Sequence, residues 1–222
     1  MDIITERQLE TAVEIAHSLF ERGKVSGSTA NISIRIGDFI YISGSGTSFG
    51  TLEKEQFSTL LLDGTHVEGI KPSKEYPLHA MIYRYKPEMK GVVHTHSFYS
   101  VLWSCLEHEK KTDVIPAYTP YLKMKVGTVG IIPYAKPGSQ ELFGYMEERI
   151  MNSDAYLLKQ HGPVVAGRTI LDAFYGLEEL EESAKTAWYL SCLLYTSVSP
   201  YPPGTGQILR IYTSRLTAPF MM

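Results

Sequence analysis

The run from Gly91 to His96 reads Gly-Val-Val-His-Thr-His, an apolar segment that ends in two histidines separated by one residue. In an extended strand, side chains at positions i and i+2 point to the same face of a sheet. We therefore expect His94 and His96 to direct both imidazoles toward one point, which suits a borderline metal ion such as zinc. Taken alone, the pattern also fits a strand with two incidental polar residues.

Composition narrows the classes of protein to consider. The chain has 222 residues, 44% of them hydrophobic, with a net charge of -3 and no basic block, so we expect no nucleic-acid partner. Its two cysteines, Cys105 and Cys192, argue against a disulfide scaffold and favour a cytoplasmic location. The N-terminus lacks the pattern of a signal peptide, and no apolar run approaches the roughly 20 residues of a membrane helix, so we expect no membrane partner.

The N-terminal third predicts a helix followed by two hairpins. Thr5 and Gln8 have the spacing of a capping box, and apolar residues then recur at helical spacing over residues 9–20. Residues 32–42 alternate as the two arms of a hairpin, and residues 57–70 have the pattern of a second hairpin. Between the hairpins, the Gly/Ser segment of residues 43–48 could hold phosphate oxygens or form a plain flexible loop.

A further helix is expected to begin near Glu75 and to end before Pro87. Glu75 would lie in its first turn, where a carboxylate interacts favourably with the helix dipole. His79 follows one turn later on the same face. We interpret His79 as a buried histidine, or as one that supports a metal ligand, and not as a ligand itself.

The C-terminal half alternates strands and helices. We predict strands over residues 129–133, 155–158 and 164–167, and helices after Ser97, over residues 140–151 and over residues 170–188. Residues 115–127 have no clear period and are expected to form a long irregular connection. The acidic run of Glu178, Glu179, Glu181 and Glu182 is interpreted as the solvated face of the last helix. His161 lies where a strand gives way to a loop, a favourable place for a site residue.

Several short motifs occur in a characteristic order, and together they carry a family resemblance. The motifs are Asn31, Ser45-Gly46, Pro72-Ser73-Lys74-Glu75, His94-Thr95-His96 and Gln160-His161-Gly162. With them, residues 5–192 resemble the class II aldolase/adducin family. The resemblance implies an α/β fold, a three-layer αβα arrangement with a central mixed, largely antiparallel sheet. It also implies a single domain, here residues 1–191, and assembly into a homotetramer.

The resemblance assigns roles to individual residues. It makes His94, His96 and His161 the ligands of one Zn²⁺ per subunit, with Glu75 as a fourth ligand that can swing away and carry a proton. Tyr121 matches a tyrosine that donates a proton from a neighbouring subunit. The substrate phosphate would be held by Asn31, Ser45, Gly46 and Ser73.

Lys74 stands where many aldolases of the family have a serine. A lysine suits a substrate with two anionic groups, so Lys74 is expected to bind the phosphate or carboxylate of a small phosphorylated sugar acid. With this difference and the segments around Tyr121 and Lys136, the chain most resembles the 3-oxo-tetronate 4-phosphate decarboxylase branch.

The expected chemistry is cleavage of a carbon–carbon bond. Three neutral imidazoles leave zinc with its full charge and an open position, as in catalytic sites. Loss of carbon dioxide next to a keto group leaves an enediolate, whose charge the metal stabilises. The expected reaction is decarboxylation of a 3-oxo-tetronate 4-phosphate to dihydroxyacetone phosphate. A fuculose-phosphate type aldolase and a ribulose-phosphate 4-epimerase are the alternatives. The complete histidine set argues against a non-catalytic, adducin-like interaction module.

Residues 192–222 depart from the family. They begin with Cys-Leu-Leu-Tyr-Thr-Ser, which resembles the translated end of a transposon adapter used in sequencing libraries, and continue with several prolines and glycines. Such residues cannot continue a helix. Our hypothesis is that residues 192–222 are an atypical, non-native tail.

Overall fold

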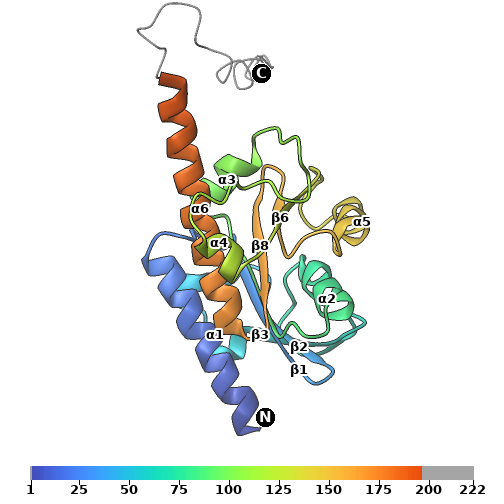
Figure 1. Cartoon of the computed structure of the whole chain (residues 1–222). Coiled ribbons are helices and arrows are strands. Elements are labelled where there is room, and N and C mark those ends of the chain that lie inside the picture. The colour runs from blue at the N-terminus through green and yellow to red at the C-terminus, as the bar shows by residue number, and fades with distance from the viewer. Residues whose placement is uncertain (1, 197–222) are drawn as a thin grey trace, which may run out of the picture.

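The structure, a computed structural model, describes residues 2–196. An eight-stranded sheet runs through the centre of this part of the chain (Figure 1). Its strand order is β4-β3-β2-β1-β5-β8-β7-β6. The strands are β1 Asn31–Ile36, β2 Phe39–Ser43, β3 Phe57–Leu61, β4 His66–Gly69, β5 Gly91–His94, β6 Val129–Ile132, β7 Ala155–Leu158 and β8 Gly162–Gly167.

The pairing is antiparallel between all neighbours except β6 and β7, which are parallel. Both predicted hairpins are present, as β1–β2 and β3–β4. The central strand β5 lies between β1 and β8, with His94 opposite Asn31 on one side and Val164 on the other. The predicted mixed, largely antiparallel sheet is therefore confirmed.

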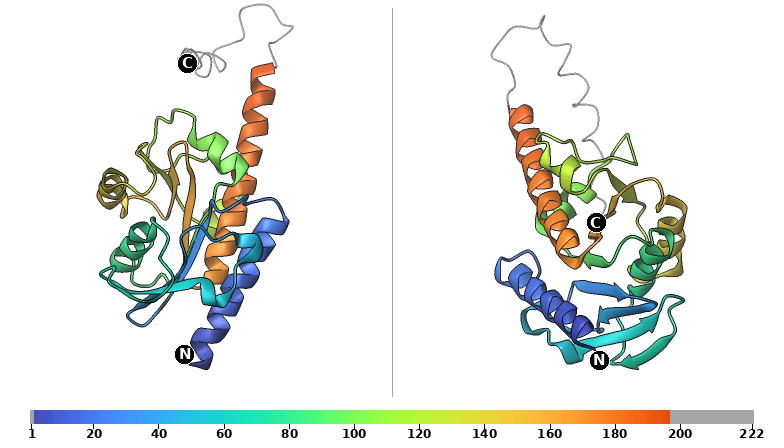
Figure 2. Two further views of the ribbon diagram at one scale, coloured as in Figure 1. Left: turned by 180° about the vertical axis from the view of Figure 1, so that it is seen from behind. Right: turned by 60° about the horizontal axis from the view of Figure 1, so that its bottom comes forward.

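Helices cover both faces of the sheet. They are α1 Ile3–Glu21, α2 Tyr76–Tyr85, α3 Phe98–Ser104, α4 Tyr121–Lys125, α5 Gln140–Arg149 and α6 Ile170–Thr196, with two short 3₁₀ turns at Phe49–Thr51 and Lys54–Gln56. Figures 1 and 2 show α1 and α6 on one side of the sheet and α2 and α5 on the other. Val93 packs in the core on the α1/α6 side and its neighbour Val92 in the core on the α2/α5 side, as alternation along a strand requires.

Several helix limits differ from the predicted ones. Helix α1 begins one turn before the predicted capping pair, because the Asp2 carboxylate accepts hydrogen bonds from the N–H groups of Ile4 and Thr5. The five-residue helix α4 lies inside the connection that we expected to be irregular. Helix α6 continues past residue 188 to Thr196 and so crosses the predicted domain boundary after residue 191. Residues 197–222 of the predicted tail lie outside the described part.

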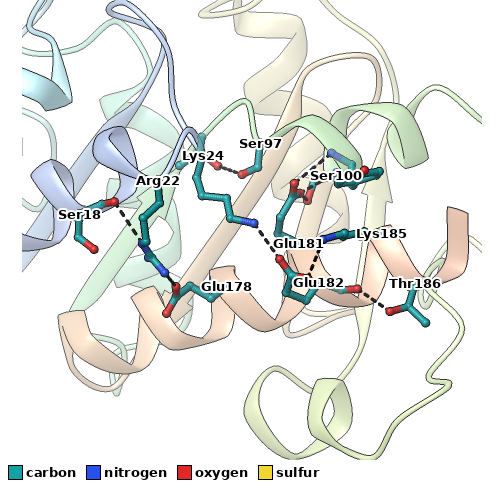
Figure 3. A network of polar contacts seen from close by, with 12 residues as sticks. Ser18, Arg22, Lys24, Ser97, Ser100, Glu178, Glu181, Glu182, Lys185 and Thr186 are labelled. Carbon is teal, nitrogen blue, oxygen red and sulfur yellow. Dashed lines mark hydrogen bonds and ion pairs between the residues drawn. The ribbon is translucent and has the colours of Figure 1, made fainter. Parts of the chain in front are cut away.

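The prediction that the acidic run faces solvent is wrong for Glu181. This carboxylate is 2% exposed and accepts hydrogen bonds from the backbone N–H of Tyr99 at 3.1 Å and of Ser100 at 2.9 Å (Figure 3). It also accepts from the Ser100 hydroxyl at 2.6 Å. Glu181 thus accepts from the first N–H groups of α3. The side chain of Ser97, the residue before this helix, makes no capping hydrogen bond and contacts Thr95 instead.

The other acidic residues of this run behave as expected of a surface. Glu178 pairs with Arg22 at the end of α1, and Glu182 pairs with Lys24 at 2.9 Å (Figure 3). Exposed pairs of this kind contribute little to stability. Within the described residues, no helix has both the length and the apolar character needed to cross a membrane.

Candidate metal centre

Three histidines converge where the central strand ends. His94 is the last residue of β5, His96 follows two residues later, and His161 lies in the turn between β7 and β8. Because β5 pairs with β8, the turn that carries His161 is brought beside His94. The ring centroids are 4.7 to 5.2 Å apart, and one nitrogen of each ring lies within 4.8 Å of the others.

The backbone around His161 is shaped to allow this convergence. Gln160 has a left-handed conformation, with φ 57°, which is uncommon for a residue other than glycine. Gly162 lies against the segment that joins the other two histidines, since a Cβ atom there would be 2.1 Å from the carbonyl oxygen of Thr95. A glycine at this position therefore permits the close approach of His161 to His96.

The His94 ring is fully buried and its tautomer is fixed. Its Nδ1–H donates to the carbonyl oxygen of Pro163 at 2.8 Å, so Nε2 carries the lone pair. That Nε2 lies 3.3 Å from Nε2 of His161. A tetrahedral zinc ion with Zn–N bonds of about 2.0–2.1 Å sets two ligand nitrogens about 3.3 Å apart. The observed spacing therefore fits a shared metal ion.

The carboxylate of Glu75 lies beside two of these imidazoles. The residue is 4% exposed, with Oε2 at 3.3 Å from His94 Nε2 and Oε1 at 3.5 Å from His161 Nε2. Among the described residues, Oε1 is buried without any hydrogen-bond partner. A carboxylate oxygen left without a partner is costly, and a cation between it and the imidazoles would satisfy it. Three nitrogens and one oxygen form a donor set that suits zinc.

The three imidazoles are held in the neutral form that binds a metal. Burial, with a contribution from His96, lowers the pKa of His94 to about 3. Burial, with a contribution from His94, lowers the pKa of His161 to about 3. Burial also lowers the pKa of His96. Neutral rings at pH 7 offer their lone pairs without first losing a proton.

The predicted phosphate-binding loop lies beside the residues that precede Glu75. Gly44 and Pro72 form an isolated β-bridge, and the Ser45 N–H donates to the carbonyl of Lys71 at 2.8 Å. The Ser73 N–H donates to the carbonyl of Ser43 at 3.3 Å. These two amides are therefore already engaged. The exposed hydroxyl of Ser45 and the neighbouring Gly46, with φ 81°, remain accessible on the loop.

Lys74 is an exposed cation in the residue position directly before Glu75. Its alkyl chain lies over Gly138, where a Cβ atom would be 3.0 Å from Lys74 Cδ. Its positive charge contributes to the lowered pKa of His96 and of His161. Within the described residues Lys74 forms no ion pair, so its charge is available to a ligand.

Tyr121 is placed differently from the other predicted site residues. It is 57% exposed at the start of α4, and its neighbour Leu122 packs in the core on the α1/α6 side of the sheet. Glu75 precedes α2, which covers the opposite side. Within one subunit, Tyr121 and Glu75 therefore belong to helical layers on opposite sides of the sheet.

Comparison with known proteins assigns the chain to a family. The family profile described as "Class II Aldolase and Adducin N-terminal domain" matches residues 10–188. The chain belongs to the class II aldolase and adducin family. Similar members include a 3-oxo-tetronate 4-phosphate decarboxylase of Haemophilus influenzae, 40% identical over 179 residues, or 80% of this chain and 85% of the relative. An L-fuculose phosphate aldolase of Methanocaldococcus jannaschii is 35% identical over 173 residues, 78% of this chain and 91% of that protein.

Solved structures of the family share the fold. The crystal structure of YgbL from Escherichia coli, described as an aldolase, epimerase or decarboxylase, has a TM-score of 0.80 and 36% identity over 84% of this chain and 91% of that one. An L-fuculose 1-phosphate aldolase has a TM-score of 0.75 at 24% identity, which supports the fold alone. The predicted family and fold are thus confirmed. Decarboxylation and aldol cleavage both break a carbon–carbon bond, in agreement with the predicted lyase class.

The sequence did not reveal which residues support Glu75. Asn31, expected to bind phosphate, donates its Nδ2–H to Glu75 Oε2 at 3.1 Å, and its Oδ1 lies 2.6 Å from Nε2 of His79. The phosphate role of Asn31 stays a prediction. The spacing of Glu75 and His79 by one helical turn was the available signal, but it could not show that Asn31 lies between them.

Proposed function

We propose that this member of the family is a zinc-dependent decarboxylase that converts a 3-oxo-tetronate 4-phosphate into dihydroxyacetone phosphate and carbon dioxide. The observation that carries the proposal is the convergence of His94, His96 and His161 on one another, with the unpartnered Oε1 of Glu75 at 3.5 Å from His161 Nε2. The similarity to decarboxylases of this specificity supports the choice of reaction.

In this proposal His94, His96 and His161 hold one zinc ion, with Glu75 beside it. The ion would supply Lewis-acid stabilisation of the negative charge that develops on the substrate oxygens. The bond between C1 and C2 of the substrate breaks, C1 leaves as carbon dioxide, and the electron pair moves toward the keto group at C3. A proton delivered to C2 then gives the ketone product.

Glu75 is suited to deliver that proton. Its carboxyl group is buried beside two of the imidazoles, just before the first turn of α2, and in this proposal the side chain rotates away from them to carry the proton. A group that carries protons at a water-poor site can protonate carbon selectively. Tyr121 of a neighbouring subunit is the second proton donor that we propose, because its own subunit leaves it exposed on α4. This role requires an oligomer, and we propose a cytoplasmic homotetramer.

The anionic groups of the substrate have separate partners in this proposal. Ser45, Gly46, Ser73 and Asn31 are the proposed phosphate ligands, on the loop and strand that lie beside Glu75. Lys74, which is unpaired within the described residues, neutralises the substrate carboxylate or phosphate. Binding energy from the phosphate, remote from the bond that breaks, would position the reacting carbon.

The direct test uses the zinc-loaded protein and a 3-oxo-tetronate 4-phosphate. We expect carbon dioxide and dihydroxyacetone phosphate in equal amounts, and a loss of both in the Glu75→Gln and His96→Ala variants. The similarity to L-fuculose phosphate aldolases favours an aldolase as the second candidate. Cleavage of L-fuculose 1-phosphate without release of carbon dioxide from the oxo acid would overturn the decarboxylase in favour of the aldolase.

A further inference from the structure

Next to Glu75, four polar side chains lie buried between β1 and α2. Asn31 is 4% exposed, and Ser33, His79 and Tyr83 are fully buried. They form one continuous series of contacts that begins at the Glu75 carboxylate. The carboxylate contacts Asn31, Asn31 contacts His79, and His79 Nδ1 lies 2.7 Å from the Ser33 hydroxyl. That hydroxyl lies 2.8 Å from the hydroxyl of Tyr83.

The fold aligns these residues through two regular spacings. Asn31 and Ser33 are alternate residues of β1 and point to the same face of the sheet. His79 and Tyr83 lie four residues apart on one face of α2, and Glu75 lies four residues before His79, immediately ahead of the helix. The strand and the helix therefore place their polar side chains opposite one another in an otherwise apolar layer, where an unpaired polar group is costly.

The donor and acceptor roles along this series can be assigned without conflict, starting from Glu75. A carboxylate at Glu75 only accepts, so the Nδ2–H of Asn31 points to it and Oδ1 points to His79. Oδ1 in turn accepts the Nε2–H of His79, which leaves Nδ1 to accept from the Ser33 hydroxyl. The Tyr83 hydroxyl has one proton, which can go to the Ser33 hydroxyl oxygen at 2.8 Å or to the Ser33 carbonyl at 3.0 Å. Each group then has a partner of the correct kind.

We propose that His79 is a positioning residue, which fixes the orientation of the Asn31 amide and thereby holds the Glu75 carboxylate against the imidazole nitrogens. The inference rests on the proposed metal centre. An asparagine amide can face either way, and at Asn31 two neighbours select the same orientation, because the Glu75 carboxylate accepts from Nδ2 and the N–H of His79 donates to Oδ1. Without that N–H, Oδ1 of Asn31 would be buried without a donor, and the amide would no longer hold Glu75 in one orientation.

The test compares two substitutions of the same residue. His79→Phe keeps a ring in the core and removes both nitrogens, whereas His79→Gln keeps one donor and one acceptor. Tyr156→Phe is the matched control, because Tyr156 is also a buried aromatic residue whose polar group forms hydrogen bonds. Its hydroxyl contacts Lys86 and backbone carbonyls and does not belong to this series. The readouts are Zn²⁺ affinity by chelator competition and the visible spectrum of the Co²⁺-loaded protein, which reports the ligands of the metal.

We expect His79→Phe to weaken Zn²⁺ binding by about 10- to 100-fold, as loss of an outer partner of a metal site typically does. Its Co²⁺ spectrum should change in the same direction as that of Glu75→Ala. His79→Gln should restore most of the affinity, and Tyr156→Phe should leave affinity and spectrum unchanged. Wild-type affinity and an unchanged spectrum in His79→Phe would overturn the proposal, as would equal losses in the Phe and Gln variants.

A milder variant keeps the test valid if His79→Phe does not fold. Ser33→Ala removes the donor to His79 Nδ1 and should weaken Zn²⁺ binding by about five-fold, the equivalent of one hydrogen bond. Wild-type affinity in Ser33→Ala would then overturn the proposal. None of these readouts needs a substrate. A wild-type protein that binds zinc but releases no carbon dioxide would overturn the decarboxylase and leave the expected differences among the variants unchanged.

Discussion

Nε2 of His94 and Nε2 of His161 lie 3.3 Å apart, although 67 positions separate the two residues in the chain. The pairing of β5 with β8 produces this proximity, and the Nδ1–H bond to Pro163 turns the lone pair of His94 toward His161. These two ring nitrogens and the buried carboxylate beside them can share one cation. The predictions that follow test this centre and the structure that supports it.

Metal content is the first quantity to measure. We expect elemental analysis to find one zinc per chain, and removal of the metal by a chelator to lower the unfolding temperature. At a free metal concentration of 100 times Kd, binding stabilises the folded state by about 2.7 kcal/mol. His94→Ala should lose both the metal and the stabilisation, while His66→Ala, at an exposed position on β4, should keep both. Full zinc content in His94→Ala would contradict the assigned ligands.

The metal-free protein should lose stability as the pH falls below about 6.5. In the folded state burial lowers the pKa of His94 and of His161 to about 3, whereas the unfolded chain has histidine pKa values near 6.5. Between pH 6.5 and 3 the unfolded state therefore binds more protons, so the free energy of unfolding decreases with decreasing pH. Urea titrations at pH 8, 7, 6 and 5 measure the effect. His161→Ala should show a smaller decrease, and an identical pH dependence in that variant would contradict the prediction.

Gly162→Ala should damage both folding and metal binding. The added Cβ would lie 2.1 Å from the carbonyl oxygen of Thr95, so the backbone between His94 and His96 must move. We expect a destabilisation of about 2 kcal/mol or more, in the range of overpacking, together with weaker zinc binding. Gly144→Ala on α5 is the matched control, because nothing lies within 4 Å of its added Cβ. That variant should be stabilised by about 0.5–1 kcal/mol. Equal effects of the two substitutions would contradict this account.

Glu181→Gln should destabilise the protein even though it lies in an acidic run. The carboxylate accepts from the backbone N–H groups of Tyr99 and Ser100 at the start of α3. The NH₂ group of a glutamine would face one of these N–H groups, and two donors cannot form a hydrogen bond. We expect a loss of about 1–3 kcal/mol in urea unfolding. Glu182→Gln, which breaks a surface pair with Lys24, should change the free energy of unfolding by less than about 0.5 kcal/mol. A Glu181→Gln variant as stable as wild type would exclude this role.

Removal of residues 192–222 should leave folding and activity intact. The side chains of Cys192 and Leu193 are exposed, the latter by 63%, although α6 continues to Thr196. We expect the free energy of unfolding to change by less than about 1 kcal/mol, as for substitutions away from the core. Thermal unfolding and carbon dioxide release of the shortened chain provide the measurement. An insoluble or inactive shortened chain would contradict the interpretation of this segment as a non-native tail.

Local patterns predicted the local structure. Alternation over residues 32–42 and 57–70 correctly gave both hairpins, and the apolar run before His94 correctly gave the strand β5. The convergence of His94 and His96 was also correct, although His96 lies beyond the end of the strand. The spacing of apolar residues shows which face of a helix or strand is buried, and in these elements the buried face is the one that the spacing predicts.

Long-range packing explains what the sequence could not predict. The burial of Glu181 depends on α3 and α6 meeting, and nothing in an acidic run shows that one of its members faces two N–H groups. The contact of Asn31 with Glu75 likewise depends on α2 lying over β1. The sequence-based limits of α1 and α6 were wrong because a single side chain, Asp2, moved the first turn and because α6 continues past Trp188.

The order of the strands has a consequence for cooperativity. Strands β1 to β4 form one half of the sheet and β6 to β8 most of the other half, with β5 as the seam between them. Glu75 and His161 come from chain segments attached to opposite halves, and His94 lies on the seam itself. An ion bound by all three would cross-link the two halves of the sheet at β5. Amide exchange in both halves should then slow together when the metal binds, because neither half could open without releasing it.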